Sequence, residues 1–153
     1  MRAASEVRRG FSLLEIVIVV MILGILGAIA APRLLGTSQQ AVDQGLRQTL
    51  SIIRDAIDSF SAENPAELPG ADGQELTLKG DLAKYLRGTE FPVCPVGAAN
   101  NNQIRMMGGT GSIVPGIAGT AATHSWVYKY ETGDFHVNSA ELSADEATTY
   151  DQF

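Results

Sequence analysis

The chain opens with a short polar segment, which is followed by a long and almost unbroken apolar run. Apart from Ser12 and Glu15, every residue from Phe11 to Ala31 is apolar or glycine. A helix over this run would rise about 30 Å, the thickness of the hydrocarbon core of a membrane. The pattern therefore predicts a helix able to span a membrane, with Glu15 near its start and no basic residue in the run to pair with it.

Beyond Pro32 the pattern becomes that of an amphipathic helix. Apolar residues recur at intervals of three and four positions, while polar and charged residues occupy the other faces. The apolar positions are Val42, Leu46, Leu50, Ile53, Ile57 and Phe60. We expect this helix to continue from the apolar run and to end near Asn64-Pro65, because the residue before a proline is biased away from helix. Its stripe requires a partner from the carboxy-terminal region.

The remaining residues predict short elements joined by turns. Residues 65–80 contain several turn formers, and Asp81 is suited to cap a short helix that ends at Leu86. Residues 100–119 are rich in glycine and asparagine, so we expect a long surface loop with a short strand at 103–107.

The clearest strand pattern is Trp126–Tyr130, where alternation places three aromatic side chains on one face. A turn at 131–134 and a return strand at 135–138 complete a hairpin, whose aromatic face would cover the apolar stripe of the helix. The tail, Glu141–Phe153, is acidic, and we expect it to be exposed and partly mobile.

Charge is distributed unevenly along the 153 residues, a length typical of one domain. The first ten residues hold three arginines and one glutamate, a net charge of +2. Because the net charge of the whole chain is −6, the remaining residues carry a net charge of −8. Because nucleic-acid binding requires a basic surface, an acidic body excludes nucleic acid as an expected partner.

The amino-terminal segment has three interpretations. It resembles a secretory signal peptide, with a small-residue site at Ala28-Ile29-Ala30 and cleavage before Ala31, or a plain signal anchor. Neither interpretation explains Glu15. A carboxylate inside a membrane costs a few kcal/mol at mid-depth and is a functional candidate by default.

The third interpretation gives Glu15 a partner. If the chain is cut between Gly10 and Phe11, the new amino group of Phe11 is cationic at neutral pH, with an ordinary pKa of about 7.7–8.0. Glu15 lies four residues further along, roughly one helical turn. In a bundle of identical, staggered helices, Glu15 of one chain can meet the amine of the next, and such a pair is strong in a low dielectric. Glu15 would then set the register of subunit addition.

At these residues the sequence resembles a known family. Gly10-Phe11-Ser12-Leu13-Leu14-Glu15, after the basic pair Arg8-Arg9 and before an apolar run, is similar to the prepilin cleavage and methylation motif of type IV pilins and type II secretion pseudopilins. The resemblance implies that a prepilin peptidase cuts after Gly10 and methylates the Phe11 amine, and that Glu15 supports methylation and assembly. Arg8-Arg9 would hold the leader on the cytoplasmic side.

Small residues at Gly24, Gly27, Ala28 and Ala31 share one helix face, which suits close helix approach. Pro32 lacks a backbone donor and tends to bend a helix. In the family, a Gly and a Pro at matching positions flank a stretch that loses helicity in the filament. We therefore expect extension between Gly24 and Pro32 in a polymer and a kink in the monomer.

The resemblance implies an α+β fold, in which a long amino-terminal helix packs on a small antiparallel sheet. It divides the chain into a leader (1–10), a transmembrane and filament-core helix (11–35), an amphipathic helix (36–64) and a globular head with a hairpin and an acidic tail (65–153). The implied partners are further copies of the chain in a helical filament, prepilin peptidase, the inner-membrane assembly machinery and, before assembly, membrane lipid. The head would lie outside the cytoplasm. Pilus and pseudopilus, and major and minor subunit, stay open, as does the alternative of a secreted or anchored domain with an ordinary signal sequence.

Catalytic chemistry is not expected. Cys94, His124 and His136 include a nucleophile and two bases, but no recognised signature surrounds them. As the single cysteine of the chain, Cys94 excludes an internal disulfide and is interpreted as a small buried hydrophobe.

No cofactor or metal is expected either. Some major pseudopilins bind calcium in a carboxy-terminal loop, and oxygen ligands suit that ion. Here Glu131, Asp134 and residues 100–102 offer oxygens without a recognisable ligand spacing, so we interpret them as solvated turn residues.

Overall fold

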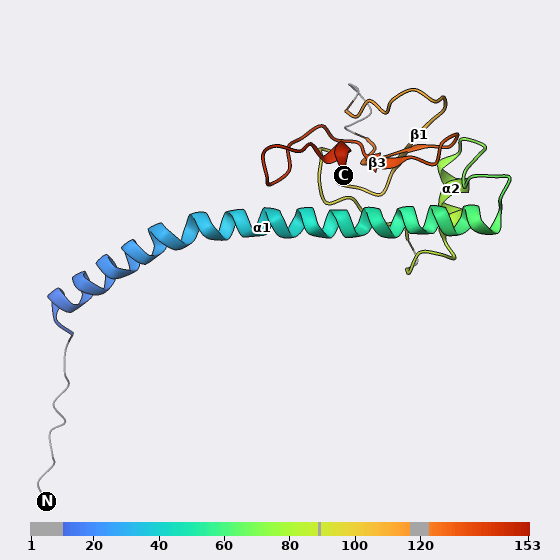
Figure 1. Ribbon diagram of the computed structural model, residues 1–153. Coiled ribbons are helices and arrows are strands. Elements are labelled where there is room, and N and C mark those ends of the chain that lie inside the picture. Colours follow the sequence, from blue (N-terminus) through green and yellow to red (C-terminus); the bar gives the residue numbers. More distant parts are fainter. Residues whose placement is uncertain (1–10, 89, 117–122) are drawn as a thin grey trace, which may run out of the picture. The chain divides into compact units, whose positions relative to one another are not determined.

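The computed structural model describes residues 11–88, 90–116 and 123–153 (Figure 1). The predicted leader and its cleavage residue Gly10 lie outside the described residues. In chain order the elements are α1 (Leu13–Glu63), α2 (Glu75–Leu82), β1 (Ile104–Met107), β2 (Trp126–Lys129), β3 (Phe135–Val137) and the 3₁₀ helix η1 (Tyr150–Gln152). The chain divides after Ser38 into two compact units, which are described in turn.

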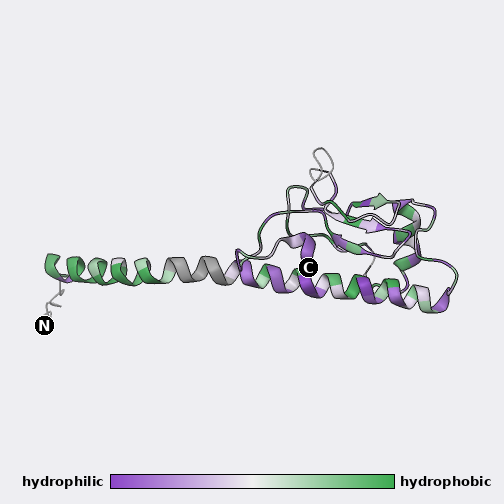
Figure 2. Ribbon diagram, turned by 45° about the horizontal axis from the view of Figure 1, so that its top comes forward, coloured by the Kyte–Doolittle hydropathy of each residue, from purple (hydrophilic) through white to green (hydrophobic). Residues whose placement is uncertain are grey.

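The first unit contains the apolar part of α1. Its stretch Leu13–Ala30 has a mean hydropathy of 2.9 and is long and apolar enough to cross a membrane. Figure 2 shows hydrophobic residues along the successive turns of this stretch. No side chain in it is buried against another described part of the chain. The hydrophobic side chains therefore have no partner within this unit.

The second unit is built on the amphipathic part of α1, as the periodicity predicts. Leu46, Leu50 and Ile53 are almost fully buried in a single hydrophobic cluster, against which Val42 and Phe60 pack in part. Each fully buried side chain of this size contributes about 1.5–3 kcal/mol relative to exposure. The helix ends at Glu63, close to the predicted position, and the next residue's side-chain amide donates to the carbonyl of Phe60 at 3.0 Å.

The sheet is small and mixed, with strand order β1-β2-β3 (Figure 1). β2 and β3 pair antiparallel and form the predicted hairpin, with Trp126 opposite Val137. β1 agrees with the strand expected within 103–107, but it pairs parallel to β2, with Ile104 opposite Trp126. The sheet is therefore not antiparallel throughout. Parallel neighbours need a connection that returns the chain to the same end of the sheet, and the long connection between β1 and β2 provides it.

Aromatic side chains join the sheet to α1. Trp126, Tyr128 and Phe135 lie in the same hydrophobic cluster as the helix stripe, and the rings of Trp126 and Phe135 are 5.4 Å apart. The indole Nε1–H donates to the carbonyl of Pro92 at 3.0 Å, so the buried ring keeps its polar group satisfied. This packing of a long helix on a small sheet confirms the predicted α+β class.

The second helix differs from its prediction. α2 covers Glu75–Leu82, whereas a helix from Asp81 to Leu86 was expected. Asp72 stabilises its start, because this carboxylate accepts the backbone N–H of Gln74 at 3.0 Å and the hydroxyl of Thr77 at 2.7 Å. Asp81 lies inside α2 and accepts the N–H of Gly70 at 2.9 Å, so it closes the preceding turn instead of capping a helix.

The expectation of an exposed tail was wrong at Ser143 and Tyr150, which are buried, whereas the mobility expected for Glu141–Phe153 stays a prediction. Tyr150 is only 2% exposed and begins η1. A β-bridge joins Leu142 to Thr149, and the turn between them is closed by the carboxylate of Asp145. An aromatic ring and hydrogen-bonded polar groups therefore accompany the charges of the tail.

Candidate functional site

Phe11 lies just before the amino-terminal end of α1, and Glu15 lies four residues further along the chain. The backbone N–H groups of Glu15 and Ile16 both donate to the carbonyl of Ser12, at 3.1 and 3.3 Å, which starts the helix. Glu15 therefore lies in the first turn. A negative charge is favourable there, because the helix dipole presents its positive end.

Both residues are open to a partner. Phe11 is 79% exposed, and Glu15 is exposed as well. Within residues 11–88, 90–116 and 123–153, no basic side chain forms an ion pair with Glu15. The assignment of cleavage at Gly10, of methylation at Phe11 and of register to Glu15 stays a prediction.

The sequence also contains a second candidate role for Glu15. Ser12 and Glu15 have the S-x-x-E spacing of a capping box, in which each side chain can bond the backbone of the other. The spacing alone could have revealed it. A local function in starting the helix therefore competes with a function in assembly, and the two differ in whether charge is needed.

The apolar part of α1 presents a continuous hydrophobic surface. Its large side chains between Leu13 and Ile29 are each about half exposed or more. Apart from the adjacent residues and the backbone of the same helix turns, no described atom lies within 4 Å of the place that a Cβ would take on Gly24 or Gly27, so the described residues give no tertiary packing reason for glycine there. α1 is helical through both Gly24 and Pro32, and the bend expected there stays a prediction.

In the head, several side-chain hydrogen bonds join the tail to α1. Asp43 is 8% exposed, and its carboxylate accepts the hydroxyl of Tyr150 at 2.9 Å and the N–H of Ala144 at 2.7 Å. The side-chain amide of Gln39 donates to the same hydroxyl at 2.8 Å. The helical periodicity had assigned Asp43 to an outward face, and its proximity to the tail has no signature in the sequence.

Two arginines continue this contact along α1. The guanidinium of Arg54 donates to the carbonyl of Phe135 at 2.8 Å and to that of Phe153 at 2.7 Å, and burial lowers its pKa. The guanidinium of Arg47 lies 3.5 Å from the centre of the Phe153 ring, a cation–π arrangement. The tail is thus bound at successive positions along one side of the helix.

The candidate nucleophile has the wrong environment for catalysis. Cys94 is fully buried, its thiol donates to the carbonyl of Val96 at 3.5 Å, and burial raises its pKa to about 11. In the described residues neither histidine hydrogen-bonds to it: His124 lies beside Thr123, and Nδ1 of His136 is 2.9 Å from the carbonyl oxygen of Asp151. The interpretation of Cys94 as a small buried hydrophobe is confirmed.

Two of the side chains considered for calcium, Asp134 and Asn101, accept hydrogen bonds within turns. The Thr132 hydroxyl donates to Asp134 at 2.7 Å and is the main cause of a lowered pKa at that carboxyl. The side-chain oxygen of Asn101 accepts the N–H of Gln103 at 3.0 Å. Among the described residues, no three His, Cys, Asp or Glu side chains gather in a group suited to a metal.

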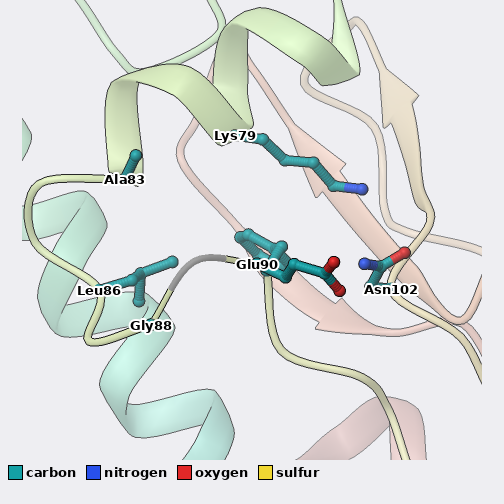
Figure 3. A pocket seen from close by; sticks show the side chains of 7 residues that line it. Lys79, Ala83, Leu86, Gly88, Glu90 and Asn102 are labelled. Carbon is teal, nitrogen blue, oxygen red and sulfur yellow. The ribbon is translucent and has the colours of Figure 1, made fainter.

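A shallow hollow of about 230 Å³ opens beside α2. Phe91 is among the residues that line it, together with Lys79, Leu86, Glu90 and Asn102, which are labelled in Figure 3. The ammonium of Lys79 is already paired with Glu75 at 2.7 Å. This combination of residues contains no arrangement for acid–base or nucleophilic chemistry.

Comparison with known proteins supports the amino-terminal motif. Residues 7–31 match the family described as the prokaryotic N-terminal methylation motif. The chain is 33% identical over 100 residues to the type II secretion system core protein G of Escherichia coli K12, which covers 65% of this chain and 61% of that protein. It is 37% identical over 57 residues to the protein of the same name from Klebsiella pneumoniae, covering 37% of this chain and 41% of the relative.

A third relative, the type II secretion system core protein G of Vibrio cholerae, is 38% identical over 55 residues, covering 36% of this chain and 38% of the relative. The chain thus spans about three fifths of the Escherichia coli protein and about two fifths of the other two. No solved structure matches. The resemblance inferred from the sequence is confirmed: the chain carries a prepilin-type methylation motif and has type II secretion pseudopilins among its relatives.

Proposed function

We propose that this protein is a structural subunit of a type II secretion pseudopilus, processed by prepilin peptidase between Gly10 and Phe11 and methylated at Phe11. The observation that carries the proposal is an exposed apolar helix, Leu13–Ala30, which has an exposed acid, Glu15, in its first turn and is preceded by the exposed Phe11. The relatives described above are named as type II secretion core proteins, which favours a pseudopilus over a type IV pilus.

Before assembly, lipid is the environment that the apolar helix requires. Its large side chains gain about 1.5–3 kcal/mol each when they leave water, and no described part of the chain covers them. We infer that the protein resides in the inner membrane with its head outside the cytoplasm. During assembly, neighbouring helices would replace lipid, and the open surfaces at Gly24 and Gly27 would allow close approach.

Pairing between chains gives Glu15 its function in this proposal. A carboxylate in the membrane is unfavourable alone, and the amine of Phe11 on an adjacent copy supplies the opposite charge. Because the two residues are four positions apart, the pairing fixes a stagger of about one helical turn, roughly 5–6 Å, between neighbouring chains.

The competing function is an exported or anchored domain with an ordinary signal sequence, cleaved before Ala31. The two proposals differ in the first residue of the mature chain. Mass spectrometry of the protein from its native membranes is expected to find a mature chain that begins at methylated Phe11. A mature chain that begins at Ala31 would end the pseudopilin proposal.

Processing itself can be tested with a matched pair of variants. Gly10→Glu places a large charged side chain at the cleavage position and is expected to leave the leader attached, whereas Gly10→Ala keeps a small residue and is expected to allow processing. If Gly10→Glu protein is still found with Phe11 at its amino terminus, prepilin peptidase is not the processing enzyme.

A further inference from the structure

The tail, Glu141–Phe153, binds α1 over the first part of the head. The hydroxyl of Tyr150 accepts a hydrogen bond from the side-chain amide of Gln39 and donates one to Asp43. The ring of Phe153 stacks against the guanidinium of Arg47, and the carbonyl of Phe153 accepts a hydrogen bond from Arg54. These four helix residues lie on one side of α1, because they follow one another at helical intervals. The tail therefore runs along the helix from its first turns in this unit.

The first turn of this unit depends on the tail. Gln39, Gln40 and Ala41 are exposed, and Val42 is only half-buried. Among the described residues, the side-chain hydrogen bonds that leave the Gln39–Asp43 turn all lead to the tail, at Tyr150 and Ala144. Nearly full burial of the helix stripe begins at Leu46. The hydrophobic core thus packs against α1 from Leu46 onward. The hydrogen bonds of the tail add contacts with the preceding residues as far back as Gln39.

The part of α1 before Gln39 has a low intrinsic preference for helix. It contains Gly24, Gly27, Pro32 and Gly36. Each glycine disfavours a helix by about 1 kcal/mol and a proline by about 3 kcal/mol relative to alanine. Between Gln39 and Glu63, by contrast, Gly45 is the only such residue. Local unfolding takes place first where stability is lowest, so α1 is expected to open from this weak segment.

The tail is able to resist that opening because its own turn is closed by internal hydrogen bonds. The carboxylate of Asp145 accepts the hydroxyl of Ser143 at 2.6 Å and the N–H of Thr148 at 2.9 Å, which closes the turn that presents Ala144 to Asp43. The carbonyl of Asp151 lies 2.9 Å from the imidazole of His136 on β3. The contacts on Gln39 and Asp43 are therefore made by a segment attached to the sheet.

We propose that the tail is a latch that sets Gln39 as the boundary between a part of α1 that can unwind and a part that stays helical with the head. Opening of the segment between Gly24 and Ser38 would then stop at the Gln39–Asp43 turn and leave the head intact. The latch is a property of the single chain. Its use in a filament, where the segment could lengthen without loss of the head, rests on the function proposed above.

Hydrogen exchange measured by mass spectrometry on the full chain in detergent micelles tests this proposal. In the unmodified chain, amides at 33–38, which follow the apolar stretch that the detergent covers, should exchange faster than those at 43–47, which marks the boundary. Tyr150→Phe removes the hydroxyl that binds Gln39 and Asp43. It should raise exchange at 43–47 at least about five- to tenfold, because the hydrogen bonds to both Gln39 and Asp43 are lost, and leave amides at 53–60 unchanged.

Tyr130→Phe is the matched control, since it makes the same chemical change in a tyrosine that lies outside the tail, and it should leave exchange at 43–47 unchanged. If Tyr150→Phe fails to fold, Gln39→Ala replaces it, because this exposed residue contributes only the contact to Tyr150. Unchanged exchange at 43–47, an equal rise over the whole head, or the absence of a boundary near Gln39 in the unmodified chain would each overturn the proposal. Because unassembled chains are measured, the outcome does not depend on whether the protein polymerises.

Discussion

The hydroxyl of Tyr150 donates a hydrogen bond of 2.9 Å to the carboxylate of Asp43, which precedes it by 107 residues. The other oxygen of that carboxylate accepts the N–H of Ala144 at 2.7 Å. Both oxygens of a nearly buried acid are therefore satisfied by groups from the tail. This contact joins the first turns of the head to its last residues, so its energy can be measured by changing Asp43 alone.

Asp43→Ala is expected to lower the free energy of unfolding by about 1–3 kcal/mol, because it leaves the Tyr150 hydroxyl and the Ala144 N–H without their acceptor. Urea denaturation of the full chain in detergent, followed by the fluorescence of Trp126, the single tryptophan, measures the change. Asp55→Ala removes an exposed carboxylate from the same helix and should stay within about 0.5 kcal/mol of the unmodified chain. Equal unfolding energies for the two variants would show that the tail contact contributes nothing.

Asp145 predicts how the tail responds to acid. Hydrogen bonds from the Ser143 hydroxyl, and then from the Thr148 and Ala147 amides, lower the pKa of its carboxyl. A lowered folded-state pKa stabilises the fold above the unfolded pKa of about 3.9, and this stability is lost as the pH falls towards the folded value. The unmodified chain should therefore have a higher urea midpoint than Asp145→Asn at pH 7, and the difference should shrink below about pH 4.

The control for this titration is Asp55→Asn, an exposed helix position where the same change should alter the midpoint little at either pH. A midpoint difference between Asp145→Asn and the unmodified chain that stays constant from pH 7 to pH 2 would contradict the assignment. In that case the turn would be held by its backbone and not by the charged form of Asp145.

Cys94 is expected to be chemically silent in the folded protein. Burial raises the pKa of its thiol to about 11, so at pH 8 about one molecule in a thousand carries the reactive thiolate. Maleimide labelling followed by mass spectrometry should therefore be slow in buffer and complete after addition of urea. Rapid labelling of the folded chain would mean that the segment around Cys94 opens readily, contrary to its full burial.

Sequence periodicity predicted the buried stripe of α1 and the position of β2. The spacing of Leu46, Leu50 and Ile53 identified the buried face of α1, and the alternation around Trp126 identified β2 and its hairpin. Alternation carries no information on strand direction, so the parallel pairing of β1 could not be inferred. β2 is also buried on both faces, Val127 included, which a one-sided pattern does not reveal.

Polar residues in the head were harder to predict because their partners are distant in sequence. Asp43 and Arg54 follow the helical period of outward positions, yet both bind residues of the tail or the hairpin. Asp72 and Asp81 are both residues of a type that can cap a helix. Only their hydrogen bonds in the structure show that Asp72, and not Asp81, stabilises the start of α2. In contrast, Phe11 and Glu15 belong to a contiguous motif, which is why the amino-terminal site could be proposed from the sequence.

Substitutions at Glu15 separate its two candidate roles. Glu15→Val should insert into membranes at least as well as the unmodified chain, because it removes a carboxylate from the apolar segment, yet it should enter filaments more than tenfold less. Glu15→Gln is the informative variant. Glutamine serves as well as glutamate in a capping box but carries no charge, so it keeps any helix-starting role and loses the pairing with the Phe11 amine.

If pairing between chains is the function of Glu15, Glu15→Gln should enter filaments as poorly as Glu15→Val. Glu15→Asp keeps the charge on a shorter side chain and should retain part of the incorporation into filaments. The fraction of the subunit recovered in sheared filaments, divided by the fraction in the membrane, measures this. Normal incorporation of Glu15→Gln would assign Glu15 to helix initiation. An amino terminus at Phe11 in all three variants is the necessary control, because a retained leader would remove the amine and mimic the loss of pairing.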